Sequence, residues 1–239
     1  MNMHTLSRFA LRLPVASDWH GPPLELLKWL ALVLMVVDHV GKYVFKGAVP
    51  GLFEAGRISV PLFVFVLACN LARPDSLSDG RYRRVLSRLA FVGLIATVPY
   101  TLLQHFVGGY WWPLNMMFTL FVGVGCASLF AAGGGKNAVF AALLFVFGGL
   151  LGEFWWPAVA LLLCVWAYFR SPSLLWLLGA LLSAASLSAI NQNQWALVTF
   201  PIVLASRWWS FPLPRVRDFF YWFYPLHFAA LLAFLALGL

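Results

Sequence analysis

The feature that most constrains this sequence is the recurrence, along its whole length, of apolar runs roughly 18 residues long with few charges. Hydrophobic residues make up 62% of the chain and charged residues 10%, whereas soluble domains carry about 25% charged residues. A larger core cannot absorb the difference, because a soluble protein still needs a polar surface. In lipid, helices satisfy their own backbone groups. We therefore predict an all-α fold, a polytopic bundle of transmembrane helices.

Breaks of charge, glycine and proline divide the chain into about nine predicted spans. They are residues 26–46, 55–72, 85–104, 114–132, 137–152, 155–169, 173–190, 195–209 and 218–238. The two short segments around Gly152 can also form one re-entrant unit. Residues 1–24 have charges and Pro14 but no long apolar stretch, so we predict a cytoplasmic segment rather than a cleaved signal peptide. Residues 25–239 then form a single transmembrane domain.

Basic residues near the span ends predict the orientation of the bundle. The strongest inside signal lies after the second span and consists of Arg73, Arg81, Arg83, Arg84 and Arg88. Alternate counting also places inside Arg8, Arg12, Lys28, Lys136, Arg170 and the loop 207–217, and it leaves the C-terminus outside. The residues that oppose this orientation are Lys42, Lys46 and Arg57.

The net charge of +8 would suggest a nucleic-acid partner in a soluble protein. Here the basic residues fall mainly between apolar spans, where they set topology, so we predict no nucleic-acid partner. Cys69, Cys126 and Cys164 all lie inside apolar spans without metal-ligand spacing, so neither a disulfide framework nor a metal is predicted from them.

Asp38 and His39 interrupt the apolar run of the first span. An ionisable residue at this depth costs several kcal/mol unless it faces the bundle interior, so a functional site is the default interpretation. The alternative is a structural pair between Asp38 and Lys42, one helical turn later. Arg57 opens the second span, where it either reaches the interface as a snorkelling side chain or balances the charge of Asp38.

Two further positions carry polar groups into the predicted bundle. His227 lies near the middle of the last span beside Pro225, which frees a backbone carbonyl, and Tyr224 lies on roughly the same helix face. We interpret His227 as functional. Asn115 begins the fourth span and is either an ordinary helix cap or part of the site.

This set of residues fits general-base chemistry. Histidine is the usual base near neutral pH. Adjacent helical residues point about 100° apart, so a cross-helix partner for His39, such as His227 or a substrate amine, is favoured over Asp38. The residue types alone leave three alternatives open, namely acyl transfer, proton-coupled transport and a metal site. Nothing in the spacing requires a metal, and none is predicted.

Four short segments resemble the TraX family, the membrane proteins that acetylate the N-terminus of conjugative pilin. They occur in the family's order at residues 27–41, 56–65, 115–123 and 220–227, and include Met-Val-Val-Asp-His-Val-Gly and Phe-Tyr-Trp-Phe-Tyr-Pro-Leu-His. The fifth to eighth spans carry no such segment. The resemblance implies an acetyltransferase of the bacterial inner membrane, and it supports acyl transfer better than it supports pilin as the acceptor.

The resemblance also implies a separate role for each group of candidate residues. Acetyl-CoA would bind at the inner face, with its phosphates on Arg81, Arg83, Arg84 and Arg88, helped by Arg215 and Arg217. His39, our first choice, or His227 would remove a proton from an amine or hydroxyl acceptor that enters from outside, such as pilin. Asp38 completes the catalytic group, and Arg57, Asn115 or Tyr224 would stabilise the oxyanion. A proton-coupled transporter and a non-catalytic pilus-assembly factor remain the alternatives.

Overall fold

The computed structural model describes residues 14–216 and 218–238, and these ranges are helical with no strand. The all-α prediction is therefore confirmed for the described residues. Arg8 and Arg12, which support the predicted orientation, lie outside them. So does Arg217, which was assigned to donor binding.

Each predicted span overlaps a helical segment whose ends shift by a few residues. The longer helices are α1 (Pro22–His39), α3 (Ser59–Leu71), α4 (Arg81–Phe106), α5 (Met116–Ala132), α7 (Trp155–Arg170), α8 (Leu174–Ser186) and α11 (Phe219–Ala236). The shorter helices are α2 (Pro50–Gly56), α6 (Gly135–Leu143), α9 (Ser188–Asn191) and α10 (Thr199–Ser206), with 3₁₀ turns η2 (Ala16–Asp18) and η5 (Trp195–Val198). Two π-helical segments, η3 (Val40–Val44) and η4 (Leu144–Gly148), continue α1 and α6.

Four helical segments have the length and composition of a membrane span. They are Pro50–Leu71, Arg81–Phe106, Leu174–Asn191 and Phe219–Ala236. Shorter apolar helices cover Met116–Ala132, Gly135–Gly148, Trp155–Arg170 and Trp195–Ser206. The number of nine crossings and the orientation of the termini stay predictions.

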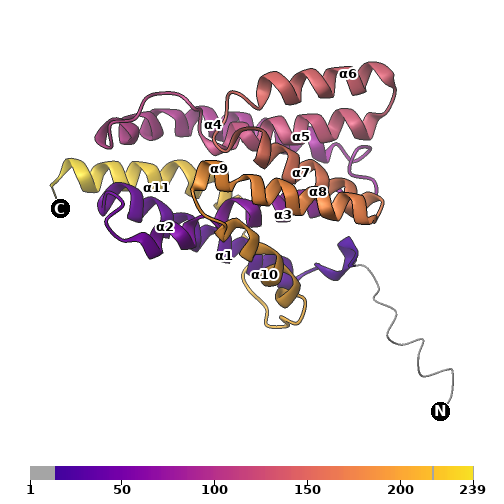
Figure 1. Cartoon of the computed structure of the whole chain (residues 1–239), viewed down its shortest axis with the longest axis horizontal. Coiled ribbons are helices and arrows are strands. Elements are labelled where there is room, and N and C mark those ends of the chain that lie inside the picture. The colour runs from indigo at the N-terminus through magenta and orange to yellow at the C-terminus, as the bar shows by residue number, and fades with distance from the viewer. Residues whose placement is uncertain (1–13, 217, 239) are drawn as a thin grey trace, which may run out of the picture.

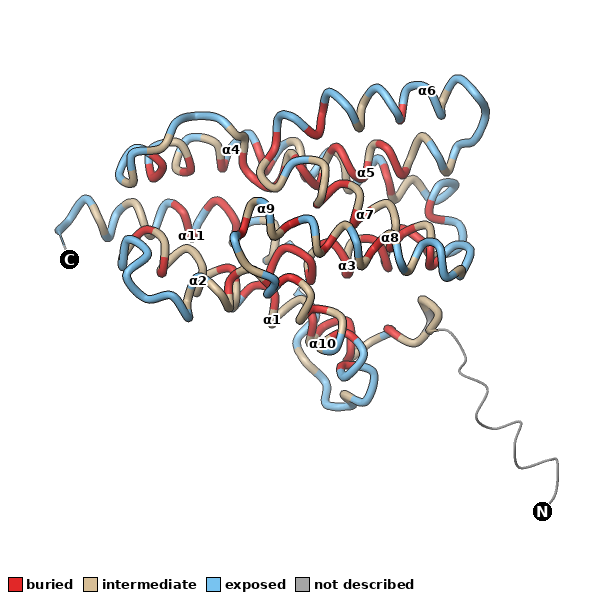
Figure 2. The backbone as a smooth tube through the Cα atoms, viewed as in Figure 1, coloured by how far each residue is buried: buried red, intermediate tan, exposed pale blue. Residues whose placement is uncertain are grey.

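The helices lie side by side around one extended core (Figure 1). Helix α4 packs against α11 and α5, and α7 packs against α3, α5 and α8. Helix α1 packs against α3 and α2, while α6 lies along the edge of the bundle and is largely exposed (Figure 2). Contacts of η3 with α1 and α11, and of α4 with α5 and α11, bring the end of α1, the start of α5 and the middle of α11 near one another.

Small residues set the spacing of the helices that carry the candidate site. A Cβ added to Gly123 of α5 would lie 2.9 Å from Cδ1 of Leu162 in α7. A Cβ at Gly93 of α4 would lie 3.1 Å from Cβ of Met117 in α5. Glycine at both positions lets the backbones approach closely, as is common where helices pack in membranes. Helix α5 is thereby held between α4 and α7.

Candidate functional site

His39, the last residue of α1, forms a hydrogen-bonded pair with His227 of α11. Nδ1 of His39 lies 2.7 Å from Nε2 of His227, and the two ring planes are 12° apart. Nδ1 of His227 lies 3.1 Å from the carbonyl oxygen of Phe223, which can only accept. With both rings neutral, Nδ1 of His227 therefore donates to Phe223, and Nδ1 of His39 donates to Nε2 of His227. The lone pair of His39 is left on Nε2.

Both helices depart from regular α-geometry beside these histidines. The π-helix η3 begins immediately after His39, and Pro225 lies inside α11 two residues before His227. A π-helical turn is rare and occurs frequently at functional sites, and an interior proline removes a backbone hydrogen bond. The fully buried ring of Phe228 lies 4.8 Å from that of His39 and 4.2 Å from that of His227, measured between centroids. The pair is therefore held in a packed, aromatic setting.

Asp38 forms an ion pair with Arg57, at the junction of α2 and α3. The side chains of Arg57 and Asp38 are 10% and 13% exposed, so both charges are largely removed from solvent. The guanidinium group also donates to Oδ1 of Asn191 at 3.4 Å and lies 4.2 Å from the centre of the Phe53 ring. Gly56 permits this contact, because a Cβ at that position would collide with Asp38. The predicted pairing of Arg57 with Asp38 is present, and the role of Asn191 was not predicted.

Lys42 does not pair with Asp38 but begins a chain of hydrogen bonds toward Glu153. Nζ of Lys42 donates to Oε1 of Gln104 at 3.0 Å, and Nε2 of Gln104 donates to the hydroxyl of Tyr100 at 2.8 Å. That hydroxyl donates to Oε1 of Glu153 at 2.9 Å, with the carbonyl oxygen of Pro113 as a second acceptor at 3.1 Å. Sequence alone predicts no function for Glu153. The available signal was that Glu153 is the one acidic residue between positions 137 and 169.

Asn115 is completely buried and caps α5. Its Oδ1 accepts from the backbone N–H of Met117 at 3.1 Å, as an N-cap side chain does. Its Nδ2 donates to the carbonyl of Gly93 at 2.9 Å and to Oγ1 of Thr97 at 3.2 Å. These contacts occupy the donors and the acceptor of the amide, so the geometry gives Asn115 a structural role and does not support the predicted oxyanion contact.

Tyr224 lies one turn before His227, and their ring centroids are 5.5 Å apart. It is 2% exposed, and its hydroxyl lies near the backbone of Met116 at the start of α5. A backbone N–H can only donate, so this neighbour leaves the hydroxyl proton free to donate elsewhere. Of the three predicted oxyanion groups, Tyr224 thus keeps a donor beside the histidine pair.

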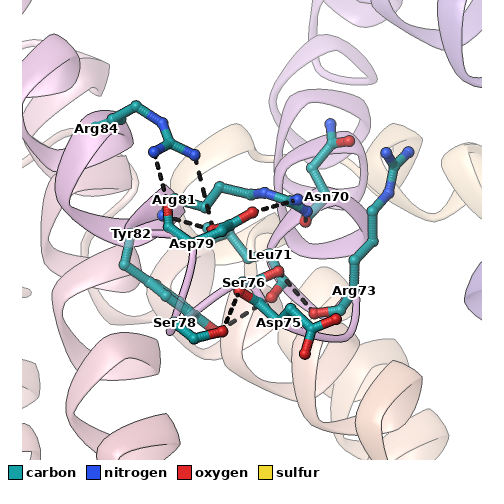
Figure 3. A network of polar contacts seen from close by, with 10 residues as sticks. All are labelled: Asn70, Leu71, Arg73, Asp75, Ser76, Ser78, Asp79, Arg81, Tyr82 and Arg84. Carbon is teal, nitrogen blue, oxygen red and sulfur yellow. Dashed lines mark hydrogen bonds and ion pairs between the residues drawn. The ribbon is translucent and has the colours of Figure 1, made fainter.

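Several of the arginines predicted to bind acetyl-CoA already contact other protein groups. Arg81 reaches from α4 to the end of α3, donating to the carbonyl of Asn70 at 2.9 Å and to Asp79 at 2.8 Å (Figure 3). Arg84 also contacts Asp79, through the backbone carbonyl at 2.5 Å. Arg88 forms an ion pair with Asp218 at 3.1 Å. Arg81 therefore secures the loop between α3 and α4 rather than facing a ligand.

A basic hollow of about 440 Å³ lies at the start of α4, where its lining residues are Gly80, Arg83, Arg84, Ser87 and Arg88. Arg81 does not line it. Neither does Arg215, which lies against Gly21 at the start of α1. Along α4, Arg88 and Tyr100 are twelve positions apart, which corresponds to about 18 Å. The ring of Tyr100 contacts Phe228, which touches both histidines. The hollow and the histidine pair are thus connected by one helix.

The sequence matches the family model described as TraX protein over residues 23–235. The chain belongs to the TraX family. Within that match lie the histidine pair, the Asp38–Arg57 ion pair and Glu153. The predicted membership is therefore confirmed. The apolar helices and the family together indicate a membrane protein.

One relative, Protein TraX of Escherichia coli, is 32% identical over 104 residues. The alignment covers 44% of this chain and 38% of that protein, which is less than half the length of the relative. No solved structure matches the chain. Among the described residues, no three His, Cys, Asp or Glu side chains gather as a metal site requires.

Proposed function

We propose that this protein is an integral membrane acyltransferase that moves an acetyl group from acetyl-CoA to an amine or hydroxyl acceptor. The observation that carries the proposal is the hydrogen bond between His39 and His227, which leaves Nε2 of His39 unprotonated. A neutral imidazole of this kind is suited to act as a general base. His227 would hold the ring in the right tautomer and stabilise the imidazolium that forms, as the third group of a nucleophile–base–orienter set does. Family membership supports the same reaction class through the resemblance described above.

In the proposed reaction, Nε2 of His39 removes a proton from the acceptor as its nitrogen or oxygen attacks the thioester carbonyl carbon. The N–C or O–C bond forms and the C–S bond breaks. The proton then passes from His39 to the departing CoA thiolate. Direct attack needs no covalent intermediate on the protein. The free proton of the Tyr224 hydroxyl makes it the best placed of the predicted groups to donate to the oxyanion.

The basic hollow at the start of α4 would bind the phosphates of CoA, with Arg83 and Arg84 as the principal donors and Arg88 as a support. The pantetheine arm of CoA reaches roughly 15–20 Å, the length of about 10–13 helical residues. That reach matches the separation of the hollow from the aromatic layer around the histidines. No residue from the fifth to eighth predicted spans is needed to hold the donor in this scheme.

The same scheme requires a defined topology. Nine crossings with a cytoplasmic N-terminus place the basic hollow at the inner face of the bacterial inner membrane, where acetyl-CoA is available. Asp38, Arg57 and the histidine pair then face the outer half, with the C-terminus extracytoplasmic. Pilin is the acceptor that the family resemblance favours, and another extracytoplasmic protein is equally compatible with the site.

A proton-coupled transporter is the second candidate, and one observation favours it. The hydrogen-bonded chain from Lys42 through Gln104 and Tyr100 to Glu153 resembles the polar relays that carry protons through membranes. A non-catalytic pilus-assembly factor is the third candidate, and no contact in the structure favours it over the others.

One experiment separates these candidates. The purified protein in liposomes is given acetyl-CoA labelled in the acetyl group together with an acceptor peptide, and label transfer and free thiol are measured. The acyltransferase predicts labelled peptide and stoichiometric thiol. Transport predicts proton uptake without thiol release, and an assembly factor predicts neither. Absence of both label transfer and thiol release in a protein that remains folded would contradict the proposed function.

A further inference from the structure

The backbone of Glu153 is held in place on both sides. Its N–H donates to the carbonyl of Leu114 at 2.9 Å, and its carbonyl accepts from Oγ1 of Thr119 at 2.5 Å. The next two residues, Phe154 and Trp155, have φ values of 63° and 46°. Bulky residues rarely adopt this left-handed conformation, which costs on the order of 1 kcal/mol or more at each position. Such strain is typically retained at functional sites, and here it accompanies a carboxyl group that is turned toward α4.

The carboxyl group of Glu153 has no cationic partner among the described residues. Oε1 accepts one hydrogen bond, from the neutral hydroxyl of Tyr100. Within residues 14–216 and 218–238, no Lys, Arg or His nitrogen lies within 4.0 Å of the carboxyl group, and no group donates to Oε2. Lys42 attracts it from a distance, but its ammonium group is bonded to Gln104. Glu153 is partly exposed, and a carboxylate partly withdrawn from water is stabilised by a cation, so this geometry suits a cationic ligand that can reach it.

Three tyrosines, one of them bonded to this carboxyl group, pack around the ring of Phe228. Tyr100 donates to Oε1 of Glu153, and Tyr43, Tyr100 and Tyr224 are each at most 2% exposed. Their ring centroids lie 6.5, 5.7 and 5.1 Å from that of Phe228. Aromatic rings attract ammonium groups through their negative faces, and clusters of such rings are used to recognise them. Carboxylate and rings therefore select the same class of ligand, an organic cation.

This cluster lies beside the proposed base. The ring of Phe228, which contacts all three tyrosines, lies 4.8 Å from that of His39. A group held at Glu153 is thus linked to the histidine pair through two aromatic rings, those of Tyr100 and Phe228. The position suits an amine substrate, which binds as a charged ammonium group but attacks only as the neutral amine.

We propose that Glu153, with Tyr100, binds the ammonium group of an acceptor amine and takes its first proton, so that the site prefers amines to alcohols. This inference rests on the proposed acyltransferase function. Transfer of a proton from ammonium to carboxylate gives a neutral amine and a carboxylic acid, which removes two charges from an apolar site. The neutral amine then attacks the thioester, and His39 removes the second proton. Glu153 releases the first proton to solvent after each turnover.

The test compares Glu153→Gln with wild-type protein on two matched acceptors. One is a short peptide with a free N-terminus, and the other carries a hydroxyl group in place of the N-terminal amino group. Glu153→Gln is expected to lower kcat/KM for the amine peptide at least tenfold at pH 7. The KM for acetyl-CoA and the rate with the hydroxyl peptide should stay within twofold of wild type. The deficit should shrink at pH 9.5, where the peptide amine, whose pKa is ordinarily about 8, is already neutral.

Two further variants guard against a merely structural effect. Tyr100→Phe keeps the ring and removes the hydroxyl, so it should lower amine activity a few-fold in the same direction. Glu54→Gln, an acidic residue of α2 outside the cluster, should change neither acceptor. Equal losses with both acceptors, or a deficit independent of pH, would overturn the inference.

Binding of the labelled amine peptide, measured without acetyl-CoA, separates failure of this inference from failure of the proposed function. Wild-type turnover with unchanged amine binding in Glu153→Gln overturns the ammonium site and leaves the acyltransferase standing. Amine binding that Glu153→Gln abolishes, without turnover in wild type, supports the site and contradicts the acyltransferase. Neither binding nor turnover in wild type contradicts both.

Discussion

Nε2 of His227 accepts a hydrogen bond from Nδ1 of His39 across 2.7 Å, although 188 positions separate the two residues in the sequence. The contact makes the two histidines unequal. His227 is committed on both ring nitrogens, to Phe223 and to His39, whereas Nε2 of His39 is bonded to no described residue. The proposed roles of base and orienting group follow from this asymmetry.

Gly56→Ala should damage the site through packing. The added Cβ would collide with Asp38, so α1 and the α2–α3 junction must move apart. Overpacking of this kind typically costs about 1–3 kcal/mol, and we expect a lower unfolding temperature in detergent together with at least tenfold slower acetyl transfer. Gly51→Ala in α2 is the matched control, because nothing lies within 4 Å of a Cβ there. Equal behaviour of the two variants would contradict the close contact.

Asp38 and Arg57 should stabilise the fold as a coupled pair. Asp38→Asn or Arg57→Gln alone leaves one largely buried charge without its partner, which typically costs about 3–5 kcal/mol. The double variant removes both charges and should unfold at a higher temperature than either single variant. Thermal unfolding of the four proteins gives the coupling free energy directly. Additive losses would show that the two charges act independently.

Asn115→Ala should lower stability more than it lowers the rate of the chemical step. The substitution removes the cap of α5, worth about 1 kcal/mol, and one of the two side-chain donors to the carbonyl of Gly93, the other being the hydroxyl of Thr97. Asn115→Ser keeps a capping acceptor for α5 and should be more stable than Asn115→Ala. A fully stable Asn115→Ala protein with strongly reduced kcat would instead support the oxyanion role predicted from sequence.

Arg83→Ala and Arg84→Ala should weaken the donor site. Each removes a guanidinium group from the basic hollow, and a charge-assisted hydrogen bond is worth about 1.5–3 kcal/mol. We expect the KM for acetyl-CoA to rise about tenfold in each variant, with little change in kcat. Added salt should raise this KM more in the wild type than in the variants, because it screens the charges that the variants have lost. Lys136→Ala, an exposed cation on the same predicted face, is the control. A similar KM rise in Lys136→Ala would point to general surface charge.

The helices and the main polar contacts of the site follow from the sequence because both rest on strong, local signals. Ionisable residues inside apolar runs must find partners, and this reasoning predicts the pairing of Asp38 with Arg57 and a cross-helix partner for His39. The contacts are in the structure, whereas the catalytic roles stay predictions. The three hydrogen bonds of Asn115 favour the helix-cap interpretation, and no sequence spacing reveals them.

The position of Glu153 is harder to predict, since it depends on a turn that sequence does not indicate. Phe154 and Trp155 adopt left-handed conformations that their residue types disfavour. Only tertiary contacts with Leu114 and Thr119 hold that turn. The engagement of Arg81 with Asn70 and Asp79 is similarly a product of the folded loop. The clustering of arginines in the sequence does not distinguish Arg81, which holds the loop, from Arg83 and Arg84, which line the basic hollow.

The most direct test of the central claim compares acetyl transfer by His39→Asn and His227→Gln. Asn retains an amide nitrogen near the position of Nδ1 but supplies no base, so His39→Asn should transfer acetyl groups at least about 100-fold more slowly. Gln places an amide oxygen near the position of Nε2 and can still accept from His39, so His227→Gln should stay within about tenfold of wild type. Near-normal transfer by His39→Asn, or a greater loss in His227→Gln than in His39→Asn, would contradict His39 as the base.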